Sequence, residues 1–264
     1  MLDKLKKLLE NIRQTQFVRS IFRMGGGFPR DVRQRMFVML NNFFMHLHPV
    51  RIPKHAIKIK YTWCMGGLSF FIFLVLAVTG MLLMFYYRPT VEFAYGDVMD
   101  MNEQVPLGIM REIHRWGAHL MIITVWLHMF RVFMTGSYKP PREFNWVIGV
   151  ILLLLTMLLS FTGYLLPWDQ LAIWGISVGS NMAAASPFAG TEGPGASLLK
   201  IGSINFVHKG ADARFVLIAG RFIGEAALVR FYVLHCVVLP FTIMIFMAVH
   251  FWRVRKDGGI SKPL

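Results

Sequence analysis

Two apolar stretches decide the fold and the candidate chemistry, IHRWGAHLMIITVWLH at 113–128 and LHCVVLPFTIMIFMAVH at 234–250. Each stretch has a histidine near either end: His114, His128, His235 and His250. A titratable or metal-binding side chain inside a run that is apolar enough to cross a bilayer is a functional candidate, because burying it there is costly.

Four apolar runs reach the length of about 20 residues that a helix needs to cross a bilayer. They lie at about 64–86, 113–135, 146–167 and 231–252. Four spans in one chain cannot close a β-barrel, so the runs are predicted to be helices. Hydrophobic residues make up 55% of the 264 residues and charged residues only 16%, which excludes a soluble domain. The expected fold is an all-α membrane protein with a bundle of four transmembrane helices.

The net charge of +14 is distributed unevenly, and this distribution predicts the topology. Segment 1–60 has 13 Lys and Arg against 3 Asp and Glu, and the 131–143 loop and the tail after His250 are also positive. The 87–113 loop is net negative, and the 168–230 loop is close to neutral. By the positive-inside rule both termini face the cytoplasm. The basic charge is therefore a topology signal and does not indicate a nucleic-acid partner.

The N-terminal segment 1–60 is interpreted as a basic extension, followed by a four-helix domain over 61–264. Apolar residues recur in it at helical spacing, with basic residues between them: Leu5, Leu8, Leu9 and Ile12. This pattern predicts an amphipathic helix that lies on an anionic membrane surface. A solvated basic tail is the alternative.

The spacing of the histidines predicts two metal sites at different depths. Fourteen residues from His114 to His128 turn a helix by about 1400°, about 40° short of four turns, and advance it by about 21 Å. The fifteen residues from His235 to His250 overshoot by about 60°, which we expect a modest helix tilt or twist to absorb. Spans two and four run in the same direction, so His114 is level with His235 and His128 with His250.

Two stacked imidazole pairs are the ligand set of two six-coordinate haem irons. The haems would lie between the helices and carry electrons through the bilayer. The alternative is that these histidines only form hydrogen bonds between helices, which we disfavour for four residues in register. His119 lies about 140° around the helix from His114, so it is predicted not to be a ligand.

Glycines in spans one and three repeat the spacing of the haem ligands. Gly66 and Gly80 are 14 residues apart, as are Gly149 and Gly163. A residue without a side chain lets a flat macrocycle approach the backbone, so all four are predicted to pack against haem. Ordinary helix packing is the alternative for either pair alone.

Haem propionates need cations near the membrane surfaces. Arg111 lies three residues before His114, and Arg131 lies three residues after His128, so each shares a helix face with its histidine. We expect both arginines to contact propionates. For Arg131, extension of the side chain to the membrane interface is an equally good interpretation.

Seven motifs lie between residues 52 and 264: CMGG at 64–67, FYYRPTV at 85–91, HRW at 114–116, HMFR at 128–131, KPPRE at 139–143, TGYLLPWD at 162–169 and RFYVLH at 230–235. Together they resemble cytochrome b6, the N-terminal four-helix half of cytochrome b in Rieske/cytochrome b complexes of the bc1 and b6f types. The 15-residue spacing from His235 to His250 resembles the b6 branch, whereas mitochondrial-type cytochromes b have 14.

The resemblance implies a quinol:cytochrome c oxidoreductase, or one with a plastocyanin-like acceptor, coupled to proton translocation. It implies that His114 and His235 bind the low-potential haem b on the positive side of the membrane, and that His128 and His250 bind the high-potential haem b on the negative side. It also implies a quinone site at each face. The partners would be a Rieske iron–sulfur protein, a c-type cytochrome and a subunit IV-like chain, in a homodimeric complex. The subunit IV-like chain would supply a Pro-Glu-Trp-Tyr segment of the quinol-oxidation site. This sequence lacks that segment, so no catalytic residue is assigned here.

The resemblance further implies that Cys64 holds a c-type haem by one thioether bond. The alternative is that Cys64 is only a small packing residue. We interpret Cys236 as a packing residue of this kind. The N-terminal extension and the loop between spans three and four are longer than in chloroplast b6. Both features suggest a bacterial complex in the cytoplasmic membrane.

Two other functions are compatible with four apolar spans. A dihaem cytochrome b anchor of a hydrogenase or formate dehydrogenase would use similar helices, but neither Cys64 nor the Pro167-Trp168-Asp169 segment. A four-span scaffold or transporter would bind no redox cofactor.

Overall fold

The computed structural model describes residues 2–18, 31–33, 54–104, 106–198, 200–201, 204–208, 210–220 and 222–260. Much of the predicted N-terminal extension therefore lies outside the described residues. Its first segment is helical as predicted: α1 (Leu2–Gln14) leaves its four apolar positions exposed, at 49 to 57% of their surface. Binding of α1 to a lipid surface stays a prediction.

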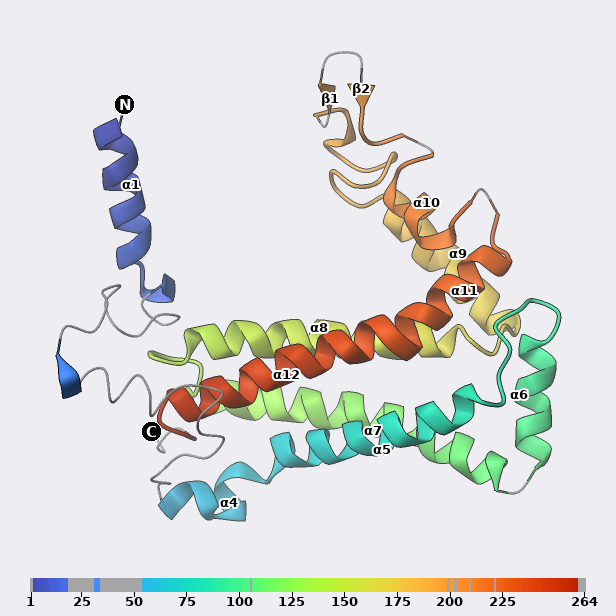
Figure 1. The fold of residues 1–264 in the computed structure, drawn as a ribbon, viewed down its shortest axis with the longest axis horizontal. Coiled ribbons are helices and arrows are strands. Elements are labelled where there is room, and N and C mark those ends of the chain that lie inside the picture. The colour runs from blue at the N-terminus through green and yellow to red at the C-terminus, as the bar shows by residue number, and fades with distance from the viewer. Residues whose placement is uncertain are drawn as a thin grey trace. The chain divides into compact units, whose positions relative to one another are not determined.

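Among the described residues, four helices are long and apolar enough to cross a membrane (Figure 1). They are α5 (Met65–Met84), α7 (Leu107–Met134), α8 (Glu143–Tyr164) and a continuous helix over Glu225–Lys256. The last consists of α11 (Glu225–Val233), a π-helical turn η3 (Leu234–Val238) and α12 (Leu239–Lys256). The prediction of four helical spans is confirmed.

Two of the helices begin earlier than the sequence predicted. The charged pair Arg111 and Glu112 belongs to α7, whose first residue follows Pro106, a residue that suits a helix start. The fourth helix begins at Glu225, because α11 buries Ala227 and Phe231 outside the most apolar part of the span. Both starts were missed because polar residues inside a helix end look like loop in a hydropathy profile.

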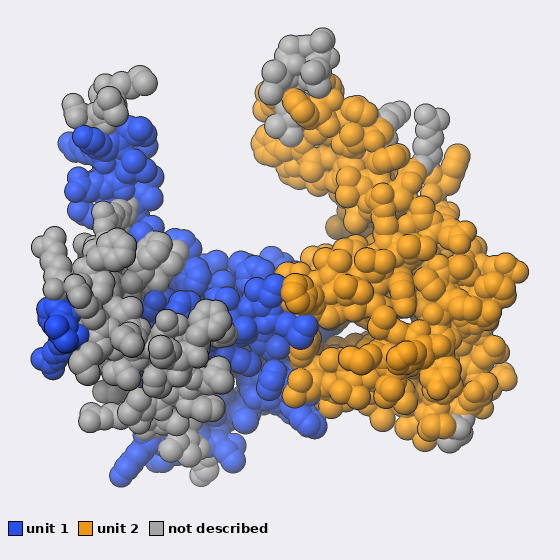
Figure 2. All heavy atoms as spheres, in the orientation of Figure 1, with its two compact units in different colours: residues 1–71, 122–155, 243–264 blue, residues 72–121, 156–242 orange. Residues whose placement is uncertain are grey.

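The chain divides into two compact units, residues 1–71, 122–155 and 243–264, and residues 72–121 and 156–242 (Figure 2). Each long helix contributes one part of its length to unit 1 and the rest to unit 2. Unit 1 contains His128 and His250, and unit 2 contains His114 and His235. The two predicted sites therefore belong to different units.

Short elements precede the first long helix or connect the long helices. They are η1 (Lys54–Ile57), α4 (Ile59–Thr62), α6 (Ala94–Glu103), α9 (Gln170–Ala184), η2 (Ala196–Leu198) and α10 (Ala213–Ile218). The expected all-α fold holds except for one two-residue antiparallel pair, β1 (Lys200–Ile201) with β2 (Ile204–Asn205).

The long loop after α8 is a packed segment. The carboxylates of Asp169 and Asp212 cap α9 and α10, accepting from backbone N–H groups at 2.8 Å. The core that these helices form with α11 consists of Leu165, Ala172, Ile176, Ile218, Ala227 and Phe231.

Tyr87 ties the end of α5 to this loop within unit 2. Its hydroxyl donates to the carbonyl oxygen of Leu166 at 2.6 Å, and its ring stacks on Tyr232 with the ring centres 5.7 Å apart. Burial raises the pKa of Tyr87, so the hydroxyl remains a donor at neutral pH.

Candidate functional site

Each unit brings one predicted histidine pair together. In unit 2 the ring centres of His114 and His235 lie 6.2 Å apart, with the ring planes at 79°. In unit 1 those of His128 and His250 lie 6.4 Å apart, with the planes at 82°. The pairing by depth that the sequence predicted is therefore the pairing that the structure brings together.

The ring separations fit a metal between each pair. An imidazole nitrogen lies about 2 Å from a bound transition metal and about 1 Å from the centre of its own ring. Two rings on opposite sides of one metal then have centres about 6 Å apart. Rings in direct hydrogen-bonded contact would be closer than this.

Two imidazoles are too few to complete a metal site. Over the described parts of the chain, no group of three or more His, Cys, Asp or Glu side chains could hold a metal ion. A metal between two imidazoles would therefore need further ligands from a bound group, and a porphyrin would supply four nitrogens.

Hydrogen bonds fix the tautomer of His114. Thr79 Oγ1 lies 2.9 Å from His114 Nδ1, and the Thr79 hydroxyl also donates to the carbonyl of Val75 at 2.8 Å. Because the hydroxyl hydrogen is used there, Thr79 Oγ1 accepts from the His114 Nδ1–H. The lone pair of His114 is then on Nε2, the nitrogen available to a metal.

His235 is held in the same way from α8. Its Nδ1 lies 3.0 Å from the carbonyl oxygen of Leu159, an acceptor, and 3.3 Å from Thr162 Oγ1. The Thr162 hydroxyl also donates to the Leu159 carbonyl, at 3.0 Å. His235 thus donates through Nδ1 and keeps the Nε2 lone pair for a ligand role.

These threonines were missed from the sequence, although a signal was present. Thr79 directly precedes Gly80, and Thr162 directly precedes Gly163, so a Thr-Gly pair recurs on α5 and α8. The corresponding glycines of unit 1 follow Met65 and Ile148, which have no hydroxyl. Only the His114–His235 site has this support from Thr-Gly pairs.

The glycines of unit 2 lie against imidazole rings. A Cβ atom on Gly80 would lie 2.9 Å from His114 Cε1. A Cβ atom on Gly163 would overlap His235 Cε1 and lie 2.9 Å from its Nδ1. The structure shows that the missing side chains make room for the paired histidines, because the close neighbours are ring atoms. Packing of these glycines against a haem macrocycle stays a prediction.

The glycines of unit 1 follow the same arrangement with looser contacts. A Cβ atom on Gly66 would lie 3.2 Å from His128 Cε1. On Gly149 it would lie 3.8 Å from His250 Cε1 and 3.6 Å from Met129 Sδ, which are ordinary van der Waals distances. Each site therefore takes two histidines and two glycines, one residue from each of the four long helices.

The two arginines predicted to meet propionates have protein contacts here. Arg111 donates to Asn102 Oδ1 at 2.8 Å. The Arg131 guanidinium lies 4.8 Å from the ring centre of Tyr61 and 6.0 Å from that of Trp63. A propionate role for either arginine stays a prediction.

Cys64 lies immediately before α5 with an exposed side chain, in the unit that holds the His128–His250 pair. Both Trp63 and Cys64 have left-handed backbone conformations, at φ 49° and 53°, which interrupt the helical backbone between α4 and α5. A Cβ atom on Gly67 would lie 3.0 Å from Cys64 Sγ, so this glycine leaves space for the thiol. Cys236 is half-buried within η3.

His119 is separate from both pairs, as the helical phase predicted. Its ring is exposed and packs edge-on against Trp116, with the ring centres 5.6 Å apart. An exposed imidazole on the same helix as two ring-paired ones is a useful control.

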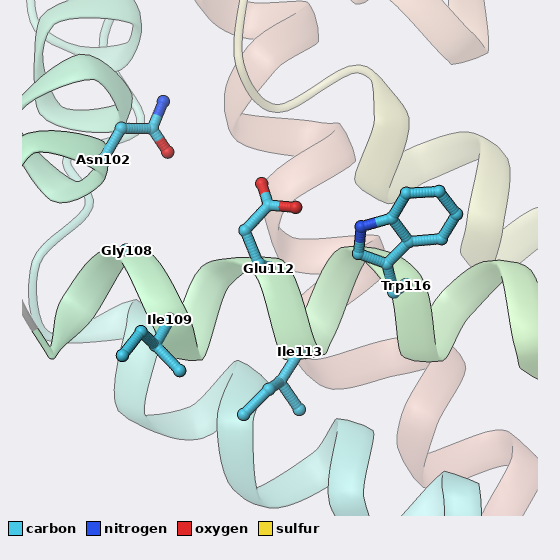
Figure 3. A pocket seen from close by; sticks show the side chains of 6 residues that line it. All are labelled: Asn102, Gly108, Ile109, Glu112, Ile113 and Trp116. Atoms are coloured by element: carbon cyan, nitrogen blue, oxygen red, sulfur yellow. The ribbon is translucent and has the colours of Figure 1, made fainter.

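A surface pocket of about 490 Å³ is lined by Asn102 of α6 and by the first part of α7 (Figure 3). Its residues are Asn102, Gly108, Ile109, Glu112, Ile113 and Trp116. The Glu112 carboxylate is held by Arg115 at 2.6 Å, so the polar part of the pocket is already satisfied. None of these residues was a candidate from the sequence.

Removing the hydroxyl of Thr79 is expected to change the midpoint potential at the His114–His235 site. A hydrogen bond from Nδ1–H makes an imidazole a stronger donor to a metal, which favours the oxidised metal. Thr79→Val should therefore raise the midpoint potential of the haem at the His114–His235 site and leave the other haem unchanged. Redox titration of the haem absorption bands measures both. Thr79→Ser keeps the hydroxyl and should behave like the native chain; an unaltered potential in Thr79→Val would contradict the assigned hydrogen bond.

The fold and the site together define a class, a membrane-spanning helical protein with two paired-imidazole sites of the kind expected in a dihaem electron carrier. The chain belongs to the cytochrome b/b6 family: the profile described as cytochrome b/b6/petB matches residues 51–194 and 209–258.

Relatives and a solved structure agree with this family. The chain is 38% identical to the cytochrome b6 of Synechococcus elongatus over 214 residues, which cover 81% of this chain and 88% of that protein. It is 40% identical to the cytochrome b6 of Heliobacterium mobile over 218 residues, 82% of this chain and 91% of that one. A chain of a hyperthermophilic respiratory Complex III matches with a TM-score of 0.61 and 25% identity, over 86% of this chain. The present chain covers 53% of that longer one.

Proposed function

We propose that this chain is the cytochrome b subunit of a membrane quinol oxidoreductase of the Rieske/cytochrome b type. In that complex it carries electrons across the bilayer between a quinol-oxidation site and a quinone-reduction site. The observation that carries the proposal is the pair of imidazole sites, whose ring centres lie 6.2 and 6.4 Å apart, each within one compact unit.

Haem b held by the two histidines of each pair would supply reversible one-electron transfer. The chain's own residues hold and orient the ligands. Thr79 and the Leu159 carbonyl accept from the Nδ1–H groups of His114 and His235, so each ring presents Nε2 to the metal. The apolar faces of four membrane-spanning helices keep water from both sites.

The assembly implied by this function supplies what the chain lacks. A Rieske iron–sulfur protein and a c-type cytochrome or plastocyanin-like protein would accept electrons. A subunit IV-like chain would complete the quinol-oxidation site. The complex would be a homodimer in the bacterial cytoplasmic membrane, with both termini of this chain cytoplasmic, and its reaction would drive proton translocation.

The dihaem anchor of a hydrogenase or formate dehydrogenase is the weaker candidate. The family match is to cytochrome b/b6, and the sequence has both Cys64 and the Pro167-Trp168-Asp169 segment, which such anchors do not need.

A reduced-minus-oxidised spectrum of the purified complex tests the main proposal. We expect an α-band that accounts for two b haems per chain and that develops when a quinol is added. A complex without this band would overturn the function. A band that dithionite develops but quinol does not would overturn the quinol donor alone.

We also propose that Cys64 holds a c-type haem by a single thioether bond. Its side chain is exposed, Gly67 leaves space beside the sulfur, and it lies in the unit of the His128–His250 pair. A covalent bond survives denaturation, whereas haem held by imidazoles does not.

The denatured native chain should therefore retain one haem, visible as peroxidase activity on a gel, and Cys64→Ser should lose it completely. Cys236→Ser is the matched control and should keep the gel signal, and all three chains should keep their b-haem spectrum before denaturation. A native chain free of haem on the gel would leave Cys64 a packing residue.

A further inference from the structure

The fourth long helix changes its winding at the histidine that it contributes to unit 2. His235 lies in η3, where the backbone N–H of Leu239 donates to the carbonyl of Leu234, five residues earlier rather than four. The helix is α-helical before and after this turn. No such turn occurs in α7, which carries the partner histidines and is α-helical throughout.

Pro240 gives a local reason for the wide turn. A proline inside a helix has no N–H to donate, and its ring collides with the carbonyl four residues earlier, which is that of Cys236. Widening the turn immediately before the proline moves this carbonyl away from the ring. The sequence therefore favours a π turn at this place in the helix.

The wide turn also changes the count of residues between the two ligands. A π turn of this kind holds one residue more than the α turn that it replaces. The fifteen residues from His235 to His250 then rotate the helix about as far as fourteen α-helical residues do, about 40° short of four turns. This is the rotation from His114 to His128 on α7.

We propose that η3 is the device that brings His235 into ligand position, by absorbing the extra residue between His235 and His250. This inference rests on the proposed haem function. It gives a specific place, η3, to the change that was expected from the sequence as a modest helix tilt or twist. The ring separations support it, because the two sites have nearly equal values, 6.2 and 6.4 Å, although the two helices have different ligand spacings.

Deleting one residue from the wide turn tests the proposal in the full complex. In ΔVal237 the turn can close to an α turn without changing the direction of either histidine. We expect two b haems per chain, both with native midpoint potentials. The matched control is ΔIle122, which removes one residue between the histidines of α7, where there is no wide turn to close. That deletion should lose at least one of the two b haems.

A second variant protects the test against a fault caused by the proline. Pro240→Ala combined with ΔVal237 gives a fourteen-residue spacing in a helix without a proline, and it should also keep both haems. The proposal is overturned if both Val237 deletions lose the haem at the His114–His235 site, or if neither chain assembles. Absence of b haem from the native complex would instead overturn the proposed function itself.

Discussion

Replacing His128 with alanine is expected to remove one of two b haems and to leave the other in place. Each haem needs both of its imidazoles, and His128 pairs with His250 in unit 1, whereas His114 and His235 pair in unit 2. Redox titration of the α-band should show that the high-potential component is absent and that the low-potential component remains. His250→Ala should give the same result.

The control for this experiment is His119→Ala, which removes an exposed imidazole from the same helix and should keep both haems. Retention of the high-potential component with loss of the low-potential one would show that the assignment of depth, and with it the topology, is wrong. Loss of both haems in His128→Ala, with normal assembly, would show that the two sites are not independent.

The second large effect is expected at Gly163. A Cβ atom there would overlap the ring of His235, and the α8 backbone that carries it cannot move freely. Overpacking of this kind costs about 1–3 kcal/mol, which is about five- to 150-fold in the affinity of a site. Gly163→Ala should therefore deplete the haem at the His114–His235 site, and Gly163→Val should deplete it further.

Gly149→Ala is the matched control on the same helix, since its Cβ would make only ordinary contacts. It should retain both haems. Equal loss of both haems in Gly163→Ala would indicate a general folding defect, and unchanged haem content would mean that this glycine serves only helix packing. Haem content per chain, measured on purified complex, distinguishes these outcomes.

The sequence predicted the four spans and the two histidine pairs because both follow from the regular geometry of the α-helix. Apolar length identifies a span, and a fourteen-residue interval returns a side chain to the same helix face. The position of His235 followed the same reasoning, but the sequence left the extra residue to a helix tilt or twist and did not predict the π-helical turn η3. A count at 100° per residue cannot include a turn with a different winding, although Pro240 marked the place.

The contacts of the rings were harder to predict than their positions. The hydrogen bonds of Thr79 and Thr162 to imidazole nitrogens cross between helices, and a sequence contains no distances across helices. The four glycines lie beside the imidazoles, a contact that the sequence did not predict, and their packing against haem stays a prediction. The contacts of Arg111 and Arg131 depend on the side chains of other elements, so spacing along α7 could not determine them.

The contribution of every long helix to both sites has a mechanical consequence. Gly66 and Gly80 belong to α5, and Gly149 and Gly163 belong to α8. In each helix one glycine lies beside one imidazole pair and the other glycine lies beside the other pair. A substitution at one of these positions is a local fault. A rigid slide or rotation of a whole helix, in contrast, would disturb both pairs simultaneously. A neighbouring subunit that pushes on α5 or α8 would thus displace residues at both imidazole pairs together.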